Sequence, residues 1–180
     1  MHIDVLVADA SHFVYADEIC EEILLSARER GTGIARRTPE YIQEKMAAGK
    51  AIIAVSDKGE FVGFSYIETW GGKEYVANSG LIVAHKFRGI GLAMRIKERV
   101  FQLSRERFPN AKIFSITTGA AVMKMNYELG FRPVTFAALT DDPDSGKAAR
   151  DAGTTRSLRR TNTACACAQV FFTTRLSTSR

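Results

Sequence analysis

The fold is decided by one stretch of sequence, Leu81-Ile82-Val83-Ala84-His85-Lys86-Phe87-Arg88-Gly89-Ile90-Gly91-Leu92-Ala93. Its apolar start predicts the end of a β-strand, and its two glycines predict a turn that opens a helix. The backbone N–H groups in the first turn of a helix have no intrahelical partner, and the helix dipole adds positive charge there. Glycines let an anion come close to that backbone because they carry no Cβ. The stretch therefore predicts a site for a phosphate-sized anion, with Lys86 and Arg88 adding charge at its mouth.

Two familiar phosphate motifs do not match this stretch. A P-loop requires Lys and then Ser or Thr directly after its second glycine, whereas Leu92 and Ala93 follow here. The dinucleotide fingerprint requires Gly or Ala three residues after its second glycine, where this chain has Met94. That fingerprint also belongs to a parallel βαβ unit, and here a meander precedes the glycines. Both motifs are therefore excluded.

The flanking sequence predicts alternating blocks of helix and strand. Apolar residues at every second position indicate strands, and apolar residues at helical spacing indicate helices. Two successive hairpins over residues 51–83 predict an antiparallel meander. The order β-α-α-β-β-β-α-β-α-β predicts a mixed α+β fold with a parallel crossover in its second half. The predicted strands cover 2–8, 51–55, 61–70, 75–83, 113–117 and 131–139, and the predicted helices cover 11–30, 38–49, 90–107 and 120–129.

The amino-acid composition of the chain changes near residue 140. We expect a globular domain over 1–140, and over 141–180 a basic loop or tail with room for a last strand at 165–173. The net charge of +5 invites a nucleic-acid interpretation. However, residues 145–180 carry seven basic side chains and one acidic one, while the other 144 residues carry 18 basic and 19 acidic. Nucleic-acid binding is therefore an alternative that depends on the tail alone.

The segment 145–158 departs furthest from the rest of the sequence. It holds one Leu and no other large apolar residue, so burial cannot offset the entropy of ordering it. One hypothesis is that this segment is read in a shifted frame. Translating the other frames of the gene across it tests that idea.

Composition and cysteine content exclude several classes of protein. No apolar run reaches the roughly 18 residues that a membrane-spanning helix needs. The first residues lack the basic and apolar regions of a secretory signal. Cys20 lies on an apolar helical face, and Cys165 and Cys167 lack the two further ligands that a zinc site requires. We therefore expect a reduced, cytoplasmic protein with no metal and no membrane partner.

The glycine stretch resembles the coenzyme A signature of the GNAT superfamily of N-acetyltransferases. That signature is Gln/Arg-x-x-Gly-x-Gly/Ala between the fourth strand and the third helix, and this chain has Lys86-Phe87-Arg88-Gly89-Ile90-Gly91 in that place. Lys86 departs mildly from the pattern. A second family mark is a helix that ends in Leu-Gly-Phe, as in Leu129-Gly130-Phe131. The resemblance implies the GNAT acyl-CoA N-acyltransferase fold, with a mixed central sheet of about six to seven strands and about four flanking helices.

The resemblance also implies a reaction, in which an acetyl group moves directly from acetyl-CoA to the primary amine of a small molecule within a ternary complex. The pyrophosphate is expected on the amides of residues 88–93, and the pantetheine arm alongside residues 81–83. An amide at a bulge in the fourth strand would stabilise the oxyanion. The coenzyme A residues implied in this way are Leu81, Ile82, Val83, Lys86, Arg88, Gly89, Ile90, Gly91, Leu92, Ala93 and Asn126.

The catalytic acid and base remain open at this point. Asn126 occupies the position of the family's usual tyrosine, and an amide is a poor acid. Tyr127 comes one residue later, about 100° further around the helix, and is a candidate acid. Glu68 is the first choice for the general base because a carboxylate is the family's common device. His85 is more readily a phosphate-side contact than a base.

The acceptor is described only by candidates. Aromatic residues at 66, 70 and 75 could line its pocket, and Arg36 and Arg37 could bind an acceptor carboxylate. Part of the sequence looks like a bacterial GNAT group associated with amino-acid biosynthesis, which makes glutamate one candidate acceptor. A second alternative is an acyl-CoA-binding GNAT-fold protein without catalysis. A homodimer is only a family-level expectation.

Overall fold

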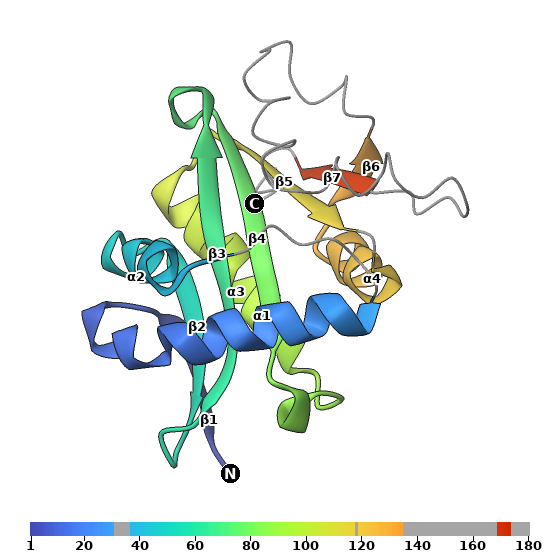
Figure 1. The fold of residues 1–180 in the computed structure, drawn as a ribbon. Helices are drawn as coiled ribbons and strands as arrows, with labels where there is room; N and C mark the ends of the chain where they lie inside the picture. The colour runs from blue at the N-terminus through green and yellow to red at the C-terminus, as the bar shows by residue number, and fades with distance from the viewer. Residues whose placement is uncertain (31–36, 118, 135–168, 174–180) are drawn as a thin grey trace.

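The computed structural model describes residues 1–30, 37–117, 119–134 and 169–173 (Figure 1). Within this part of the chain a single sheet of seven strands has the order β1-β2-β3-β4-β5-β7-β6. Only β4 and β5 run parallel to each other, and every other neighbouring pair is antiparallel. The predicted mixed α+β fold is confirmed. The strands are β1 Ile3–Val7, β2 Ala51–Ser56, β3 Phe61–Trp70, β4 Tyr75–Val83, β5 Lys112–Thr117, β6 Arg132–Val134 and β7 Gln169–Thr173.

Helices cover both faces of this sheet. The α-helices of the described part are α1 Ala16–Arg30, α2 Pro39–Ala47, α3 Leu92–Arg107 and α4 Ala120–Glu128. Helices α1 and α2 lie over the front face in Figure 1, and α3 lies behind the sheet. Thr38 caps α2 by accepting a hydrogen bond from the Tyr41 amide, and Pro39 occupies the first helical turn. The largest fully buried side chains, among them Phe61, Phe64 and Ile96, lie in the core between these layers.

Three predicted boundaries differ from the structure, each for a physical reason. Helix α3 begins at Leu92 and not at residue 90, because Gly91 has a φ of +78° that no right-handed helix contains. The first predicted helix opens as a 3₁₀ segment, η1 Ala10–Tyr15, before α1 continues it. The last strand covers 169–173, inside the predicted range, and it pairs with both β5 and β6. Residues 135–168 lie outside the described residues.

An irregularity in β4 shapes the centre of the sheet. Phe64 of β3 is opposite Ile82, whereas Tyr66 is opposite Ser79, so β4 carries one extra residue between these pairs. This is a β-bulge, and it includes Gly80 with a φ of +66°. A Cβ on Gly80 would lie 2.2 Å from Cε1 of Tyr66, so the glycine is required for the ring to pack there. The bulge and the buried tyrosine are therefore one packing unit.

Strands β4 and β5 separate close to this bulge. Their parallel pairing covers only Tyr75–Ala77 against Lys112–Phe114. Beyond that point β4 continues towards the glycine stretch, still paired with β3 on its other edge. The sheet is therefore split on one side of the bulge, and the split leads to the start of α3.

Candidate functional site

The glycine stretch forms an open backbone turn at the start of α3. A short 3₁₀ segment, η3 His85–Phe87, is followed by Gly89 at φ +84° and Gly91 at φ +78°. A Cβ on either glycine would meet no atom of the described residues within 4 Å, so none of them fills the space next to this backbone. Gly91 is the N-cap of α3 and makes no side-chain hydrogen bond to it. The first-turn amides of a sixteen-residue helix thus face open space, which suits an anion.

The two cations of the stretch already have acidic partners. Nζ of Lys86 lies 2.7 Å from Oε1 of Glu60, and this contact holds the pKa of the glutamate below its usual value. Nη1 of Arg88 lies 2.8 Å from Oε2 of Glu29 on α1, and its Nε donates to the carbonyl of Val83 at 3.1 Å. The charge that both residues add at the mouth is therefore partly offset by these glutamates. The capacity to hold an anion rests mainly on backbone N–H groups.

The other predicted coenzyme A residues line a path from the bulge to α3. Ile82 and Val83 are buried, and Leu81 is half-buried. In α3, Leu92 is buried and Ala93 is half-buried, while Ile90 before the helix is exposed. The structure thus brings the predicted residues of the strand and of the helix start together along the split edge of β4.

The two neighbouring candidates on α4 point in different directions. Asn126 is fully buried, and neither its Oδ1 nor its Nδ2 has a hydrogen-bond partner in the described part of the chain. A buried amide without partners costs about 1–3 kcal/mol, so this side chain is suited to a ligand that can satisfy it. Tyr127 is 58% exposed, and the Arg132 guanidinium lies 4.6 Å from its ring centre. The structure therefore places Tyr127 at the surface and Asn126 in the interior.

Glu68 is partly buried within β3, facing α2, and is not a solvent-exposed charge at a strand end. Its Oε2 lies 3.0 Å from Nζ of Lys45 on α2, and its side chain is 20% exposed. Burial raises the pKa of Glu68 to about 7, although the nearby positive charge of Arg37 opposes that rise. Burial also lowers the pKa of Lys45. A carboxyl group with these properties can take up and release a proton near neutral pH.

Cations and phenol rings surround this carboxyl group. Nε of Arg37 donates to the hydroxyl of Tyr66 at 2.8 Å. The ring of Tyr41 lies 5.2 Å from the Arg37 guanidinium and 4.7 Å from Nζ of Lys45. Tyr41 and Tyr66 meet edge to face at 5.8 Å. This arrangement can hold an anionic group next to Glu68. The other predicted arginine, at residue 36, lies outside the described residues.

The two remaining aromatic candidates for the acceptor pocket, Trp70 and Tyr75, lie further along the same strands. Trp70, at the end of β3, is stacked on Phe114 at 5.4 Å. Tyr75 is opposite Trp70, and both pack against Ala77 where β4 and β5 are still paired. His85 is exposed in η3.

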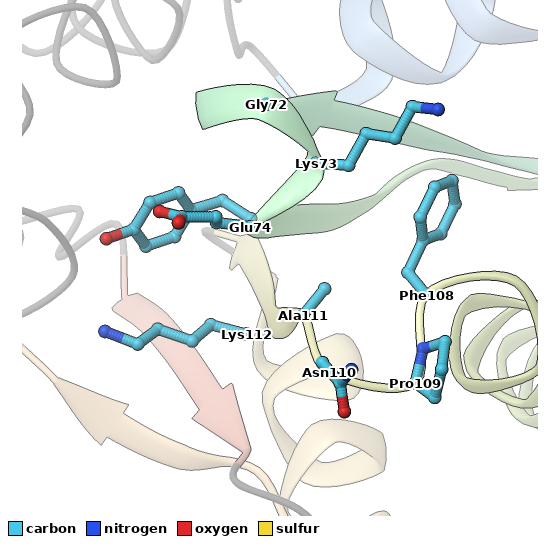
Figure 2. Close-up of a pocket in the computed structure, with 9 residues that line it drawn as sticks. Gly72, Lys73, Glu74, Phe108, Pro109, Asn110, Ala111 and Lys112 are labelled. Atoms are coloured by element: carbon cyan, nitrogen blue, oxygen red, sulfur yellow. The ribbon is translucent and has the colours of Figure 1, made fainter.

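A hollow of about 520 Å³ lies at the opposite end of the sheet (Figure 2). It is lined by residues 72–75 and 108–112, which are the turn into β4 and the segment that joins α3 to β5. Helix α3 separates it from the glycine turn, and sixteen residues of α-helix span about 24 Å. This hollow is therefore distinct from the site described above.

The described residues form neither a membrane-spanning helix nor a metal-binding cluster. None of the helices they form is both long and apolar enough to span a bilayer. Among the same residues, no group of three or more His, Cys, Asp or Glu side chains could hold a metal ion.

Sequence reasoning missed two buried lysines, Lys45 on α2, described above, and Lys97 on α3. Lys97 is 2% exposed, and its Nζ donates to the Ser115 hydroxyl of β5 at 3.3 Å. The signal was available, because Lys97 falls on the same helical stripe as Val100 and Ser104, both of which are buried.

Comparisons with known proteins identify the fold. No protein-family model and no curated protein match the chain. N-acetylglutamate synthase from Neisseria gonorrhoeae, complexed with coenzyme A and N-acetyl-glutamate, matches 96% of this chain with a TM-score of 0.67 and 14% identity. An acetyltransferase of the GNAT family from Staphylococcus aureus matches 95% of the chain with a TM-score of 0.64 and 16% identity. A GNAT superfamily phosphinothricin acetyltransferase from Sinorhizobium meliloti, in complex with acetyl-CoA, matches 75% with a TM-score of 0.58 and 15% identity.

The chain therefore has the GNAT fold, and the resemblance noted in its sequence is confirmed at the level of the fold. It spans 35% of the length of the Neisseria enzyme, 98% of the Staphylococcus protein and 77% of the Sinorhizobium protein.

Proposed function

We propose that this protein is an N-acetyltransferase that moves an acetyl group from acetyl-CoA to a primary amine of a small molecule. One observation carries the proposal. The bulged strand β4 parts from β5 along an edge that leads directly to the open, glycine-bounded start of α3. That arrangement offers an anion site, an unpaired strand edge and a bulge amide in succession, which suits a diphosphate, a pantetheine arm and a thioester in that order.

The residues that would hold acetyl-CoA fit that molecule in chemistry. The amides at the start of α3 suit its phosphates, and the orphaned side chain of Asn126 suits an amide of the pantetheine arm. Glu68 would take the proton that the acceptor ammonium must lose before it attacks. A backbone N–H at the β4 bulge would donate to the carbonyl oxygen as negative charge develops there. Acetyl-CoA supplies the activated acyl group.

We further propose that the acceptor carries a carboxylate, as an amino acid such as glutamate does. Arg37 and Lys45 lie beside Glu68 and supply positive charge for a carboxylate next to a base for the amine. The Neisseria neighbour with the same fold is complexed with N-acetyl-glutamate, which supports this class of acceptor.

Coenzyme A binding is tested with a matched pair of glycine variants, Gly91→Ala and Gly59→Ala. Both glycines have a positive φ, of +78° and +74°, and a Cβ on either meets no protein atom. The backbone strain of about 1–2 kcal/mol is therefore alike in the two variants. Calorimetric titration should show coenzyme A affinity falling at least tenfold in Gly91→Ala and staying within twofold in Gly59→Ala. Equal affinities in both variants would contradict the proposed site.

Turnover is tested by coenzyme A release from acetyl-CoA over a panel of amines. We expect release with amino acids that carry a free α-amine, glutamate among them, and little with the matching amines that lack the carboxylate. Acetyl-CoA binding without turnover on any amine would favour the acyl-CoA-binding alternative, which Asn126 at the usual donor position supports. No release with glutamate, but release with other amines, would remove only the acceptor proposal.

A further inference from the structure

A second set of polar side chains lies on the α3 side of the sheet, where β4 and β5 part. The last paired residues are Ala77 and Phe114, so the next residues along the two strands are Asn78 and Ser115. Both are buried, and each is bonded to a side chain of α3. Nδ2 of Asn78 donates to Oγ of Ser104 at 2.7 Å, and Nζ of Lys97 donates to Oγ of Ser115 at 3.3 Å. Helix α3 thus presents a lysine and a serine beneath the point of separation.

Lys97 is the one charged member of this set. Its ammonium lies 5.6 Å from the ring centre of Phe131, and 2% of the residue is exposed. Within the described residues, burial alone lowers its pKa, to about 8, and no charged group contributes to the shift. A buried ammonium without a carboxylate partner is costly, and an apolar side chain of similar length would fill the same space. Packing therefore gives no reason for a lysine here.

Lys97 is connected to the end of α4 through Phe131. The amide of Phe131, whose ring Lys97 faces, donates to the carbonyl oxygen of Asn126 at 3.0 Å. Asn126 has no partner for its side chain, and Asn78 has none for its Oδ1. Two buried side chains, those of Asn78 and Asn126, therefore retain unmet hydrogen-bonding capacity within the described part of the chain. This second observation, independent of the lysine, indicates that a ligand enters between β4 and β5.

We propose that Lys97 is the proton donor to the sulfur of coenzyme A during acetyl transfer. The inference rests on the proposed N-acetyltransferase function. The amine nitrogen forms a bond to the acetyl carbon, the carbon–sulfur bond breaks, and its electron pair goes to sulfur. Sulfur takes a proton from Nζ of Lys97, which becomes a neutral amine. The proton lost by the acceptor goes to Glu68, and both side chains exchange with water once the products leave.

The other candidate acids are less suited to this step. Tyr127 is 58% exposed and lies against Arg132, and the amide of Asn126 is not an acid. A thiol has a pKa of about 8.5, close to that of the Lys97 ammonium, so the proton passes between groups of similar acidity. Matched acidity is what efficient proton transfer requires.

The test uses Lys97→Met, which keeps the length of the side chain and removes the proton. We expect kcat to fall about 10²-fold or more, while the dissociation constant of coenzyme A changes less than threefold. A second readout does not depend on turnover. The thiol of bound coenzyme A is titrated by the ultraviolet absorbance of its thiolate. The ammonium should lower the thiol pKa in the wild type, and Lys97→Met should return it to the value of free coenzyme A.

The matched control is Lys112→Met, which removes an exposed lysine at the start of β5. It should leave both readouts within twofold of the wild type. An unchanged kcat in Lys97→Met, or a wild-type complex whose thiol titrates like free coenzyme A, would overturn the proposal. The wild-type titration decides the matter even if the variant fails to fold. A wild type that binds coenzyme A but acetylates no amine would refute the transferase function, whatever its thiol titration gives.

Discussion

Lys45 and Lys97 are buried lysines on opposite faces of one sheet, and their surroundings differ. Lys45 on α2 lies 3.0 Å from a carboxylate oxygen and under the ring of Tyr41, whereas Lys97 on α3 has a serine hydroxyl and the ring of Phe131. The first lysine shares its burial with a base, so charge can be exchanged within the pair. The second has no carboxylate partner among the described residues, and burial lowers the pKa of its ammonium to about 8. Under the proposed mechanism, proton uptake belongs to one face and proton delivery to the other.

The largest effect is expected from Glu68→Gln, which removes the base on the α2 face and keeps the size of the side chain. We expect kcat to fall about 10²- to 10⁴-fold, the usual contribution of a general base. Coenzyme A affinity should stay within twofold, because its proposed contacts lie along β4 and α3. Steady-state kinetics and calorimetry provide the measurements. A variant that retains a tenth or more of the wild-type kcat would contradict the proposal that the base lies on the α2 face.

Replacing the isolated lysine should increase stability. The pKa of Lys97 is lowered from 10.5 to about 8, so its stabilising contribution is present above pH 10.5 and is lost as the pH falls through 8. At pH 7 the wild type therefore bears a penalty on the order of 3 kcal/mol. Lys97→Met should raise the free energy of unfolding by that order at pH 7 and by little at pH 10.5. Denaturant unfolding at the two pH values measures this, and lower stability at pH 7 would contradict it.

Replacing the lysine on the other face, Lys45, by Met should instead lower the free energy of unfolding. Lys45→Met leaves the carboxyl of Glu68 without its ammonium partner, so we expect destabilisation of about 1–3 kcal/mol at pH 8. It should also raise the pKa of Glu68 above its value of about 7. Since the base acts only when deprotonated, the rise of kcat with pH, centred near 7 in the wild type, should move to higher pH. If Lys45→Met and Lys97→Met change the free energy of unfolding in the same direction, the proposed difference between the two lysines is wrong.

A smaller change is expected from Ser115→Ala, which removes the hydroxyl that Lys97 bonds. Loss of that acceptor should cost about 0.5–1.5 kcal/mol and lower the pKa of the lysine further. The fall of kcat at high pH, which reports deprotonation of the acid, should therefore begin at lower pH. Ser65→Ala is the control, because this buried hydroxyl donates to the Ser79 carbonyl on the neighbouring strand. It should cost similar stability and leave that limb of the pH profile in place.

The sequence was sufficient to predict the glycine turn and the meander, and it drew attention to Glu68 as a candidate base. These follow from local patterns, since a turn, a strand or a helix start is determined within a few residues. The partners of Arg88 could not be predicted in this way, because Glu29 lies 59 residues away along the chain. The position of β7 between β5 and β6 is non-local for the same reason.

Burial of polar side chains was the other point that local patterns did not reveal. Glu68 was recognised by its type, but its raised pKa comes from the cover that α2 and its neighbours provide. Lys97 was overlooked because helical periodicity identifies the buried stripe but does not show that a charge will remain within it. The hydrogen bond to Ser115 joins α3 to β5, and that contact forms only in the folded chain.

The contact between Gly80 and Tyr66 has a consequence for how this sequence can evolve. Any side chain at position 80 would collide with the tyrosine ring, and the hydroxyl of that ring is bonded to Arg37. A lineage that replaced the glycine would have to shorten the tyrosine in the same step, and the arginine would then lose its hydrogen bond to the tyrosine hydroxyl. Three positions in separate parts of the chain should therefore covary among descendants of this protein. A change of acceptor would begin with substitutions around these three positions, because changing any one of them requires the others to change with it.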